Sequence, residues 1–384
     1  MDKQISGLKI LLICCFSFFM VACNVSGGGL SGGASGGQQK ATATPTEIPN
    51  KETQQVNQPE EAPPTSAIPT AVPQPRGRIA FISNRDGDRK MYMMSLDKQS
   101  ALLLGSNVTQ ASSPHWSSNG KFLTFVAETN KNTDIFLVNA DAGELNRLTD
   151  DPAKDDAPAW SPDGQKIAFE SYRDQNWEIY TVNRNGSGLT RITNSPAGDN
   201  NPVWSPDGQK ISFVSNRDGN GSIYIVNPDG SGLTRITQGV AAASDPVWSP
   251  DSHSLAFRLW PTSGVANICI ADISSLQQDC YTNNVETGIP AWSPNQEYLA
   301  FRSKINQSWQ ISILDLKTKQ INQLSFDVTP SGDPVWAPDS LYLAFQAHYK
   351  DNMEIFYADI ITQTANLLTG DVTASYNGEP SWSQ

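Results

Sequence analysis

The sequence predicts an all-β protein, a seven-bladed β-propeller built from four-stranded antiparallel blades. Three observations support this fold class. A tryptophan motif recurs every 44 residues, each recurrence contains four short strand patterns, and the two ends of the repeat region hold complementary halves of one unit. A fixed period in the forties with four strands per unit is typical of a propeller rather than of a single irregular domain.

The repeat is clearest at residues 160–169, which read Trp-Ser-Pro-Asp-Gly-Gln-Lys-Ile-Ala-Phe. In the Ser-Pro-Asp-Gly segment, proline presets φ at the first corner and glycine takes the position closed to residues with a Cβ. The motif therefore predicts a strand, a tight turn and a second strand. Each motif tryptophan has a proline two residues before it and a phenylalanine nine residues after it: Trp116, Trp160, Trp204, Trp248, Trp292 and Trp336.

One unit shows how the period makes a blade. Its strands are predicted at residues 158–160, 166–170, 178–182 and 189–192, with turn residues between them. They are nearly continuous apolar runs without clean alternation, which is the pattern of sheets covered on both faces. In a propeller, the neighbouring blades provide that cover.

The ends of the repeat region predict how the ring closes. Phe81 is a seventh motif phenylalanine, but the residue nine positions before it is Val72, so the first blade lacks its tryptophan strand. Trp382 is a seventh motif tryptophan with no phenylalanine after it. We therefore expect the C-terminal strand to complete the N-terminal blade, which removes open sheet edges. The alternative, a right-handed solenoid with frayed ends, does not explain the complementary halves.

The region before the repeats has two predicted parts. Residues 1–22 combine a positively charged start with a short apolar run, which is typical of a signal peptide, and Met20-Val-Ala-Cys23 resembles a bacterial lipobox. Cys23 would then carry the lipid, although an ordinary cleaved signal is the alternative. Residues 23–76 are rich in Gly and Ser and then in Thr and Pro, with too little apolar surface to fold, which predicts a disordered tether. The propeller is expected over residues 77–384.

These features predict an extracytoplasmic, lipid-anchored protein whose only membrane attachment is the N-terminal lipid. In a Gram-negative host this means the periplasm, and Asn24 favours the outer membrane; otherwise it means the outer face of the cell membrane. The net charge of −12, with few basic clusters, argues against nucleic acid as a partner.

The two cysteines of the propeller predict a disulfide. Cys269 and Cys280 are eleven residues apart, and an equal offset joins third-strand aromatic residues to fourth-strand arginines in other units: Phe136 to Arg147, Tyr180 to Arg191 and Tyr224 to Arg235. If those pairs face each other across a hairpin, the cysteines do too. A cross-strand disulfide fits an oxidising compartment. The alternative is a pair of buried free thiols.

The predicted loops fall on two faces. Loops from the second to the third strand, and those between blades, share what we call the upper face, while the regular Ser-Pro-Asp-Gly turns occupy the lower face. The upper loops vary and carry aromatic residues, which is where binding sites are expected on a rigid scaffold. The candidate loop residues are Tyr172, Trp177, Trp260, Trp309 and His348.

Polar residues just before the tryptophan strands are expected at the upper mouth of the channel: Asp156, Asn200, Asp245, Asp333 and Glu379. One interpretation is an acidic mouth that captures a basic segment, a cation or a sugar. The other is that these are turn and capping side chains in solvent. We expect no cofactor and no metal, because His253 falls in a lower turn and His348 in an upper loop, too far apart to converge with His115.

The units resemble the repeats of the TolB-type propeller, in the Trp-Ser-Pro-Asp-Gly core and in the Ser215-Asn-Arg-Asp-Gly-Asn220 loop before Ile223. The resemblance covers about residues 77–384 and implies the fold. Similar blades occur in periplasmic scaffolds, in peptidase propellers and in polysaccharide lyases, so the resemblance implies no single activity. The family's namesake has six blades and a preceding α/β domain, whereas this chain has seven blades and a linker.

The sequence-based hypothesis is a non-enzymatic binding or scaffold protein that engages envelope proteins through the upper face. One alternative is a receptor with a glycan or peptide site in the channel mouth. A lyase-like enzyme is a further alternative, and it would need an acid/base pair converging near the channel. The sequence shows no such pair, so we predict no catalytic residue.

Overall fold

The computed structural model describes residues 75–96, 100–239, 241–261, 264–370 and 376–383. The predicted signal peptide, the predicted lipidation site Cys23 and the predicted tether up to residue 74 lie outside these residues. No helix in the described part of the chain could cross a membrane.

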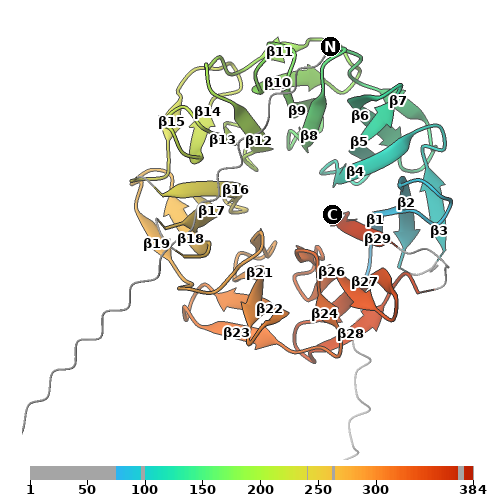
Figure 1. The fold of residues 1–384 in the computed structure, drawn as a ribbon, viewed down its shortest axis with the longest axis vertical. Helices are drawn as coiled ribbons and strands as arrows, with labels where there is room; N and C mark the ends of the chain where they lie inside the picture. The colour runs from blue at the N-terminus through green and yellow to red at the C-terminus, as the bar shows by residue number, and fades with distance from the viewer. Residues whose placement is uncertain (1–74, 97–99, 240, 262–263, 371–375, 384) are drawn as a thin grey trace, which may run out of the picture. The chain divides into compact units, whose positions relative to one another are not determined.

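All regular structure in this part is β-strand, arranged in seven antiparallel sheets around a central axis (Figure 1). Blade 1 contains β1 (Arg78–Ser83), β2 (Lys90–Ser95), β3 (Ala101–Leu104) and the C-terminal β29 (Asn377–Trp382). Blade 2 contains β4 (Thr109–Trp116), β5 (Phe122–Thr129), β6 (Asn132–Asn139) and β7 (Leu145–Arg147). Blade 3 contains β8 (Asp155–Trp160), β9 (Lys166–Ser171), β10 (Glu178–Asn183) and β11 (Thr190–Arg191).

The other four blades follow the same order. Blade 4 contains β12 (Asp199–Trp204), β13 (Ile211–Ser215), β14 (Ser222–Val226) and β15 (Thr234–Arg235). Blade 5 contains β16 (Ala242–Trp248), β17 (Ser254–Trp260), β18 (Asn267–Asp272) and β19 (Gln278–Cys280). Blade 6 contains β20 (Ala291–Trp292), β21 (Tyr298–Ile305), β22 (Ser308–Asp315) and β23 (Ile321–Leu324). Blade 7 contains β26 (Tyr342–Tyr349), β27 (Asn352–Asp359), β28 (Thr364–Leu367) and an inner strand split into β24 (Thr329–Pro330) and β25 (Val335–Trp336).

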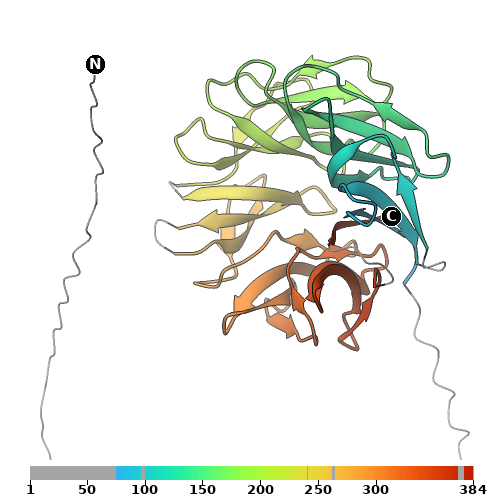
Figure 2. The ribbon, with the colours of Figure 1, turned by 45° about the vertical axis from the view of Figure 1, so that its right-hand side comes forward.

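The ring closes as predicted. Strand β29 pairs antiparallel with β1, with Ile79 opposite Trp382 and Ser83 opposite Asn377. In Figure 1 the red C-terminal strand lies beside the blue N-terminal one. The seven-bladed propeller is thereby confirmed, and the turned view shows the strands of each blade running between the two faces of the ring (Figure 2).

The repeated residues form the contacts between strands and between blades. All seven motif phenylalanines are fully buried, and five face an aromatic ring on the third strand at 5.8–6.1 Å between centroids. Six of the tryptophan indoles donate Nε1–H to a backbone carbonyl: those of Trp116, Trp160, Trp248, Trp292, Trp336 and Trp382. For the first five the acceptor lies in the preceding blade, so this belt of hydrogen bonds ties neighbouring blades together, whereas the Trp382 indole donates to the carbonyl of Arg76, just before β1 of its own blade.

Three arginines in the upper Arg-Asp loops act as structural clamps. Arg173 pairs with the buried Asp155 at 3.1 Å, and Arg217 pairs with the buried Asp199 at 2.7 Å. The guanidinium of Arg85 donates to Asn377 at 3.2 Å. Each guanidinium also lies over the phenylalanine and tyrosine of its own blade. A contact repeated in three blades is a property of the scaffold rather than of one ligand site.

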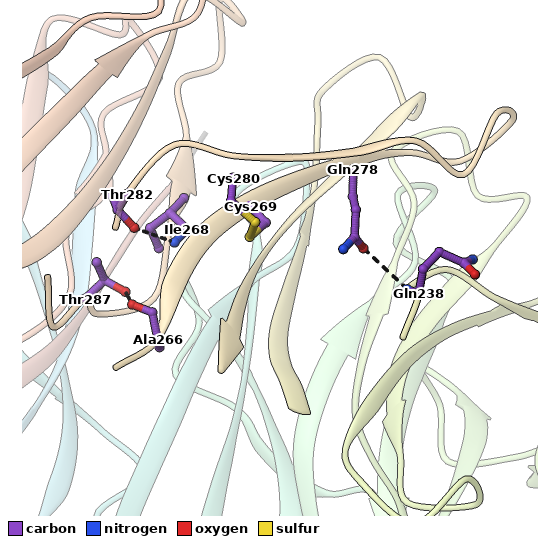
Figure 3. The surroundings of a disulfide bond; sticks show 8 residues. All are labelled: Gln238, Ala266, Ile268, Cys269, Gln278, Cys280, Thr282 and Thr287. Atoms are coloured by element: carbon purple, nitrogen blue, oxygen red, sulfur yellow. Dashed lines mark hydrogen bonds between the residues drawn. A yellow bond between two sulfur atoms is a disulfide. The ribbon is translucent and has the colours of Figure 1, made fainter. Parts of the chain in front are cut away.

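Cys269 and Cys280 stand opposite each other on β18 and β19 and form a disulfide, with 4.0 Å between their Cα atoms (Figure 3). Cys269 also faces Phe257, so it occupies the place that a third-strand aromatic takes in five other blades. The covalent bond therefore replaces an aromatic–arginine pair in holding the outer strand of blade 5.

Candidate functional site

In blades 3, 4 and 5 the upper mouth of the channel is built where the inner strand bulges. The pairing register shifts between Asp156 and Ala159, between Asn200 and Val203, and between Ser244 and Val247. Within these bulges Ala157, Asn201 and Asp245 adopt positive φ angles of 50–56°. A bulge turns side chains away from the regular ladder, and here it turns them toward the second strands.

The side chains that contact the mouth residues come from the second strand of a blade, at the position immediately after the repeat phenylalanine. That position is apolar in three blades but polar in four, where Glu170, Arg258, Arg302 and Gln346 occupy it. These four side chains contact mouth residues or the backbone beside them. The mouth is therefore a set of polar pairs, and its carboxylates do not all face solvent.

In blade 5, Asp245 pairs with Arg258. Its Oδ2 accepts from Nε of Arg258 at 2.7 Å and from Nη2 at 2.6 Å, and the hydroxyl of Ser244 donates to the same oxygen. The guanidinium of Arg258 also lies over the ring of Trp260, with 4.7 Å from Cζ to the centroid. The ion pair and the ring contact together fix the orientation of the guanidinium.

A second arginine–tryptophan pair stands on the next blade. Nε of Arg302 donates to Oδ1 of Asp333 at 3.2 Å, and Nη1 donates to the carbonyl of Ser331 at 2.6 Å. Its Cζ lies 4.3 Å from the ring centroid of Trp309. Arg302 thus joins blade 6 to the inner strand of blade 7.

Gly288 makes room for Asp333. A Cβ on Gly288 would lie 1.9 Å from Oδ1 of Asp333, far inside any allowed contact. The amide of Ile289 donates to the same carboxylate. Burial raises the pKa of Asp333 despite the neighbouring Arg302 and Arg258, so the carboxylate depends on these donors to remain charged.

The two arginine–tryptophan pairs line one hollow, which we call the blade 5–6 pocket. It has a volume of about 310 Å³ and is bounded by Arg258, Trp260, Gly264, Val265, Ala266, Glu286, Thr287, Arg302 and Trp309. The predicted loop residues Trp260 and Trp309 therefore meet in one place, although they come from different blades. Two guanidiniums, two indoles and two aliphatic residues give it both polar and apolar walls.

Besides the two arginine–tryptophan pairs, the blade 5–6 pocket is bounded by the segment that leads into blade 6. Thr287 bridges to Ser303 on β21, and its hydroxyl donates to the carbonyl of Ala266 at 2.9 Å (Figure 3). Glu286 pairs with Lys304 at 3.1 Å. This segment begins just after the disulfide, where Thr282 accepts a hydrogen bond from the amide of Ile268 at 2.8 Å.

The other predicted mouth residues lie elsewhere on the ring. Asp156 and Asn200 stand near Glu170, which accepts a hydrogen bond from the amide of Asn201 at 2.7 Å. Burial raises the pKa values of both Asp156 and Glu170. Glu379 accepts from the amide of Ser113 at 2.7 Å and so joins the closing strand to blade 2.

The remaining loop predictions do not reach the pocket. Tyr172 and Trp177 contact each other edge-to-face at 5.4 Å in the β9–β10 loop of blade 3. His348 is exposed on β26 and stands opposite Thr329 and Met353. Within the described ranges, no three His, Cys, Asp or Glu side chains are placed to hold a metal ion.

A larger hollow of about 730 Å³ lies at the opposite, lower end, lined by inner-strand tryptophans and turn prolines. His115 is the one ionisable side chain among its described lining residues. The lower mouth is therefore largely apolar. Groups that can recognise charge are concentrated in the upper pocket.

Arg258, Arg302 and Gly288 were not predicted as site residues from the sequence. The signal for the two arginines is present in the alignment of the repeats, because the position after the phenylalanine changes from Val126 and Val214 to arginine in two consecutive units. Gly288 has no such signal, since its role depends on a carboxylate 45 residues further along the chain.

The fold and the site define a seven-bladed propeller with a polar and aromatic pocket between two blades at its upper mouth. Residues 75–287, more than half of the chain, match the family model of the TolB beta propeller domain, and the chain belongs to this family. No curated protein matches the chain in sequence.

Solved structures share the fold at low identity. TolB from Acinetobacter baumannii is 23% identical, with a TM-score of 0.55, and the match covers 70% of this chain and 68% of that one. An oligogalacturonate lyase in complex with manganese is 14% identical, with a TM-score of 0.63 and coverages of 73% and 85%. A Mycobacterium tuberculosis puromycin-hydrolyzing peptidase is 13% identical, with a TM-score of 0.61, and the match covers 76% of this chain but only 53% of the peptidase. Because these neighbours include enzymes and a TolB, the fold by itself assigns no activity.

Proposed function

We propose that this protein is a non-enzymatic, lipid-anchored binding module outside the cytoplasm, which captures envelope proteins through the upper face of its propeller. The observation that carries this proposal is the blade 5–6 pocket. The sequence predicted Trp260 and Trp309 in loops, but Trp260 is the last residue of β17 and Trp309 lies at the start of β22, each at the edge of an upper loop, and a guanidinium lies over each ring. Tryptophan and arginine are the residue types most enriched at the energetic centres of protein interfaces.

The arrangement of the two faces supports this choice. Five of the lower turns after the inner tryptophan repeat one backbone hydrogen bond, from the third residue after the turn serine back to its carbonyl. The upper connections instead range from the two residues Asn306–Gln307 to the six residues 172–177. Variation on one face of a uniform scaffold is typical of a recognition surface.

The place on the ring where the described chain begins also supports a binding role for the upper face. Gly77 lies against Trp382, and the Trp382 indole donates to the carbonyl of Arg76 at 3.0 Å. Both contacts are at the lower end of the ring, so the described chain begins at the face opposite the pocket.

A photo-crosslinking experiment in cells tests the proposal. A photoreactive amino acid replaces Tyr172 or Trp309 on the upper face and, as matched controls, Leu233 or Ile361 in exposed lower turns, in the full chain. We expect adducts with defined envelope proteins from the upper positions only. Adducts of equal yield from both faces, or from neither, would refute an upper-face binding role.

A glycan receptor is the second candidate, because a 310 Å³ hollow with two indoles also suits a small ligand. It predicts saturable binding of a purified oligosaccharide in the absence of any protein partner. Loss of that binding in a Trp260→Ala variant, with no protein crosslinks from the upper face, would favour this candidate over the scaffold.

A further inference from the structure

The two guanidiniums of the blade 5–6 pocket have donors left over. Arg258 directs Nε and Nη2 to Asp245, and its Nη1 reaches the carbonyl of Thr287 only at 3.4 Å, which is a long hydrogen bond. Arg302 uses Nε and Nη1, and its Nη2 has no hydrogen bond to any described residue. An arginine carries five N–H donors, so both Arg258 and Arg302 can donate further hydrogen bonds to an anionic ligand.

The counter-ions are not among the described residues that line the hollow. Both arginines line the pocket, whereas Asp245 and Asp333 are absent from its described lining. The side chains of Asp245 and Asp333 are 16% and 29% exposed. Among the described lining residues Glu286 is the one carboxylate, and it pairs with Lys304. The pocket therefore presents more positive than negative charge, although the whole chain is acidic.

The donors are fixed in position before any ligand arrives. Each guanidinium lies over an indole ring, at 4.3–4.7 Å from the centroid, and is paired with a carboxylate, and these two contacts restrict its rotation. Such planar forks match the geometry of a carboxylate better than an ammonium does. Little side-chain entropy remains to be lost when the ligand binds.

Apolar surface adjoins these donors. Val265, Ala266 and the two indoles line the same hollow. Its volume is at the small end of the range for ligand pockets, which suits a single residue rather than a long chain. A C-terminal residue carries a carboxylate and an apolar side chain on one Cα, and it combines both requirements in that volume.

We propose that the blade 5–6 pocket binds the C-terminal carboxylate of a protein partner, with the apolar side chain of the last residue against Trp260 and Trp309. This inference rests on the proposed function, because it names the part of the partner that the upper face recognises. Arg302, with its uncommitted Nη2, is the main carboxylate donor, and Arg258 is the second.

Calorimetric titration of the full chain with three probes tests the proposal. The probes are acetyl-glycyl-leucine with a free carboxylate, the same peptide with a C-terminal amide, and glucuronate. We expect the acid to bind at least tenfold more tightly than the amide, and more tightly than glucuronate. We also expect the preference to weaken as salt is raised, since part of it is electrostatic.

Variants locate the binding. Arg302→Gln combined with Asp333→Asn removes both charges of the pair, so no buried carboxylate is left unpaired, and it should equalise the affinities for acid and amide. Arg147→Gln is the matched control, because Arg147 also forms an upper-face ion pair, with Asp134 at 2.7 Å, but on the outer strand of blade 2. This control should keep the full preference. A circular dichroism spectrum and melting curve verify that each variant is folded.

Three outcomes would overturn the proposal. Equal affinities of the wild-type protein for acid and amide would exclude carboxylate recognition. Tighter binding of glucuronate would identify an acidic sugar as the ligand. Preference retained in the Arg302→Gln, Asp333→Asn variant would move the site elsewhere. Upper-face protein crosslinks without acid–amide preference refute this inference alone, whereas preference without crosslinks refutes the scaffold function alone.

Discussion

Reduction of the Cys269–Cys280 bond perturbs one blade without changing the sequence. The bond closes a loop of eleven residues between β18 and β19. In the chain-entropy treatment, such a loop constrains the unfolded state by about 9 cal/mol/K, which corresponds to about 3 kcal/mol at 25 °C. The two strands share only three residue pairs, one of which is the cysteine pair itself, so no long ladder compensates for the loss.

The expected change in melting temperature follows from the size of the propeller. An unfolding entropy of about 2.1 cal/mol/K per residue over residues 77–384 converts 3 kcal/mol into a decrease of about 5 °C. The assay is differential scanning calorimetry of the oxidised protein and of protein treated with a dithiol reductant. Mass spectrometry after alkylation confirms the redox state of Cys269 and Cys280 in each sample.

A Cys269→Ala, Cys280→Ser variant is the control. It should melt near the reduced wild-type protein and should not respond to reductant. A fully reduced wild-type protein that melts within 1 °C of the oxidised one would refute the entropic argument. Two alkylated cysteines in protein that has never met reductant would refute the disulfide itself.

Three further predictions use the same calorimetric assay. Gly288→Ala should lower the free energy of unfolding by about 1.5–3 kcal/mol, the contribution of a hydrogen bond to a charged group, because the new Cβ would displace the Asp333 carboxylate. Gly198→Ala is the control, since the nearest atom to a Cβ there would be 3.4 Å away. An equal loss of stability in both variants would contradict this reasoning. Glu170→Gln should raise the free energy of unfolding at pH 7, because burial raises the pKa of Glu170 in the folded protein and the folded state is therefore less stable once this carboxyl is ionised. The stability gained from the substitution should vanish at acidic pH, where Glu170 is protonated in both the folded and the unfolded state. A gain that does not change with pH would contradict this reasoning. Trp248→Phe should lower the free energy of unfolding by about 1 kcal/mol more than Trp204→Phe does, because of these two indoles only that of Trp248 donates a hydrogen bond to a described residue. Equal losses of stability in the two variants would show that the indole hydrogen bonds contribute nothing.

The fold could be predicted from the sequence because it is repetitive. Each unit reports the same four strands and the same turn, so local ambiguity in one copy is resolved by the others. The closure was also predictable, because Phe81 and Trp382 each lack the partner that the other supplies. The register of Cys269 and Cys280 followed from offsets in intact units, since those offsets measure cross-strand pairing directly.

The inner strand of blade 7 shows where repetition stops helping. The motif residues Val335 and Trp336 pair with β26 as they do elsewhere, but the upper half of the strand is a separate element, β24. The segment between Pro330 and Val335 carries Gly332, where a Cβ would lie 2.7 Å from that of Gln346. The same segment holds the two groups that accept hydrogen bonds from Arg302 of blade 6, the Ser331 carbonyl and the Asp333 carboxylate.

The site was only partly predictable, because it depends on contacts between units that the repeat does not encode. Aromatic loop residues were found individually, but nothing in their spacing shows that Trp260 and Trp309 face one hollow while Tyr172 and Trp177 face each other. The acidic mouth residues were likewise found, but their charges are balanced by second-strand arginines in two places. Once those arginines are included, the chemistry expected at the mouth changes from the capture of a cation to the recognition of an anion. The carboxylates that suggested an acidic site instead position the guanidiniums that would bind the ligand.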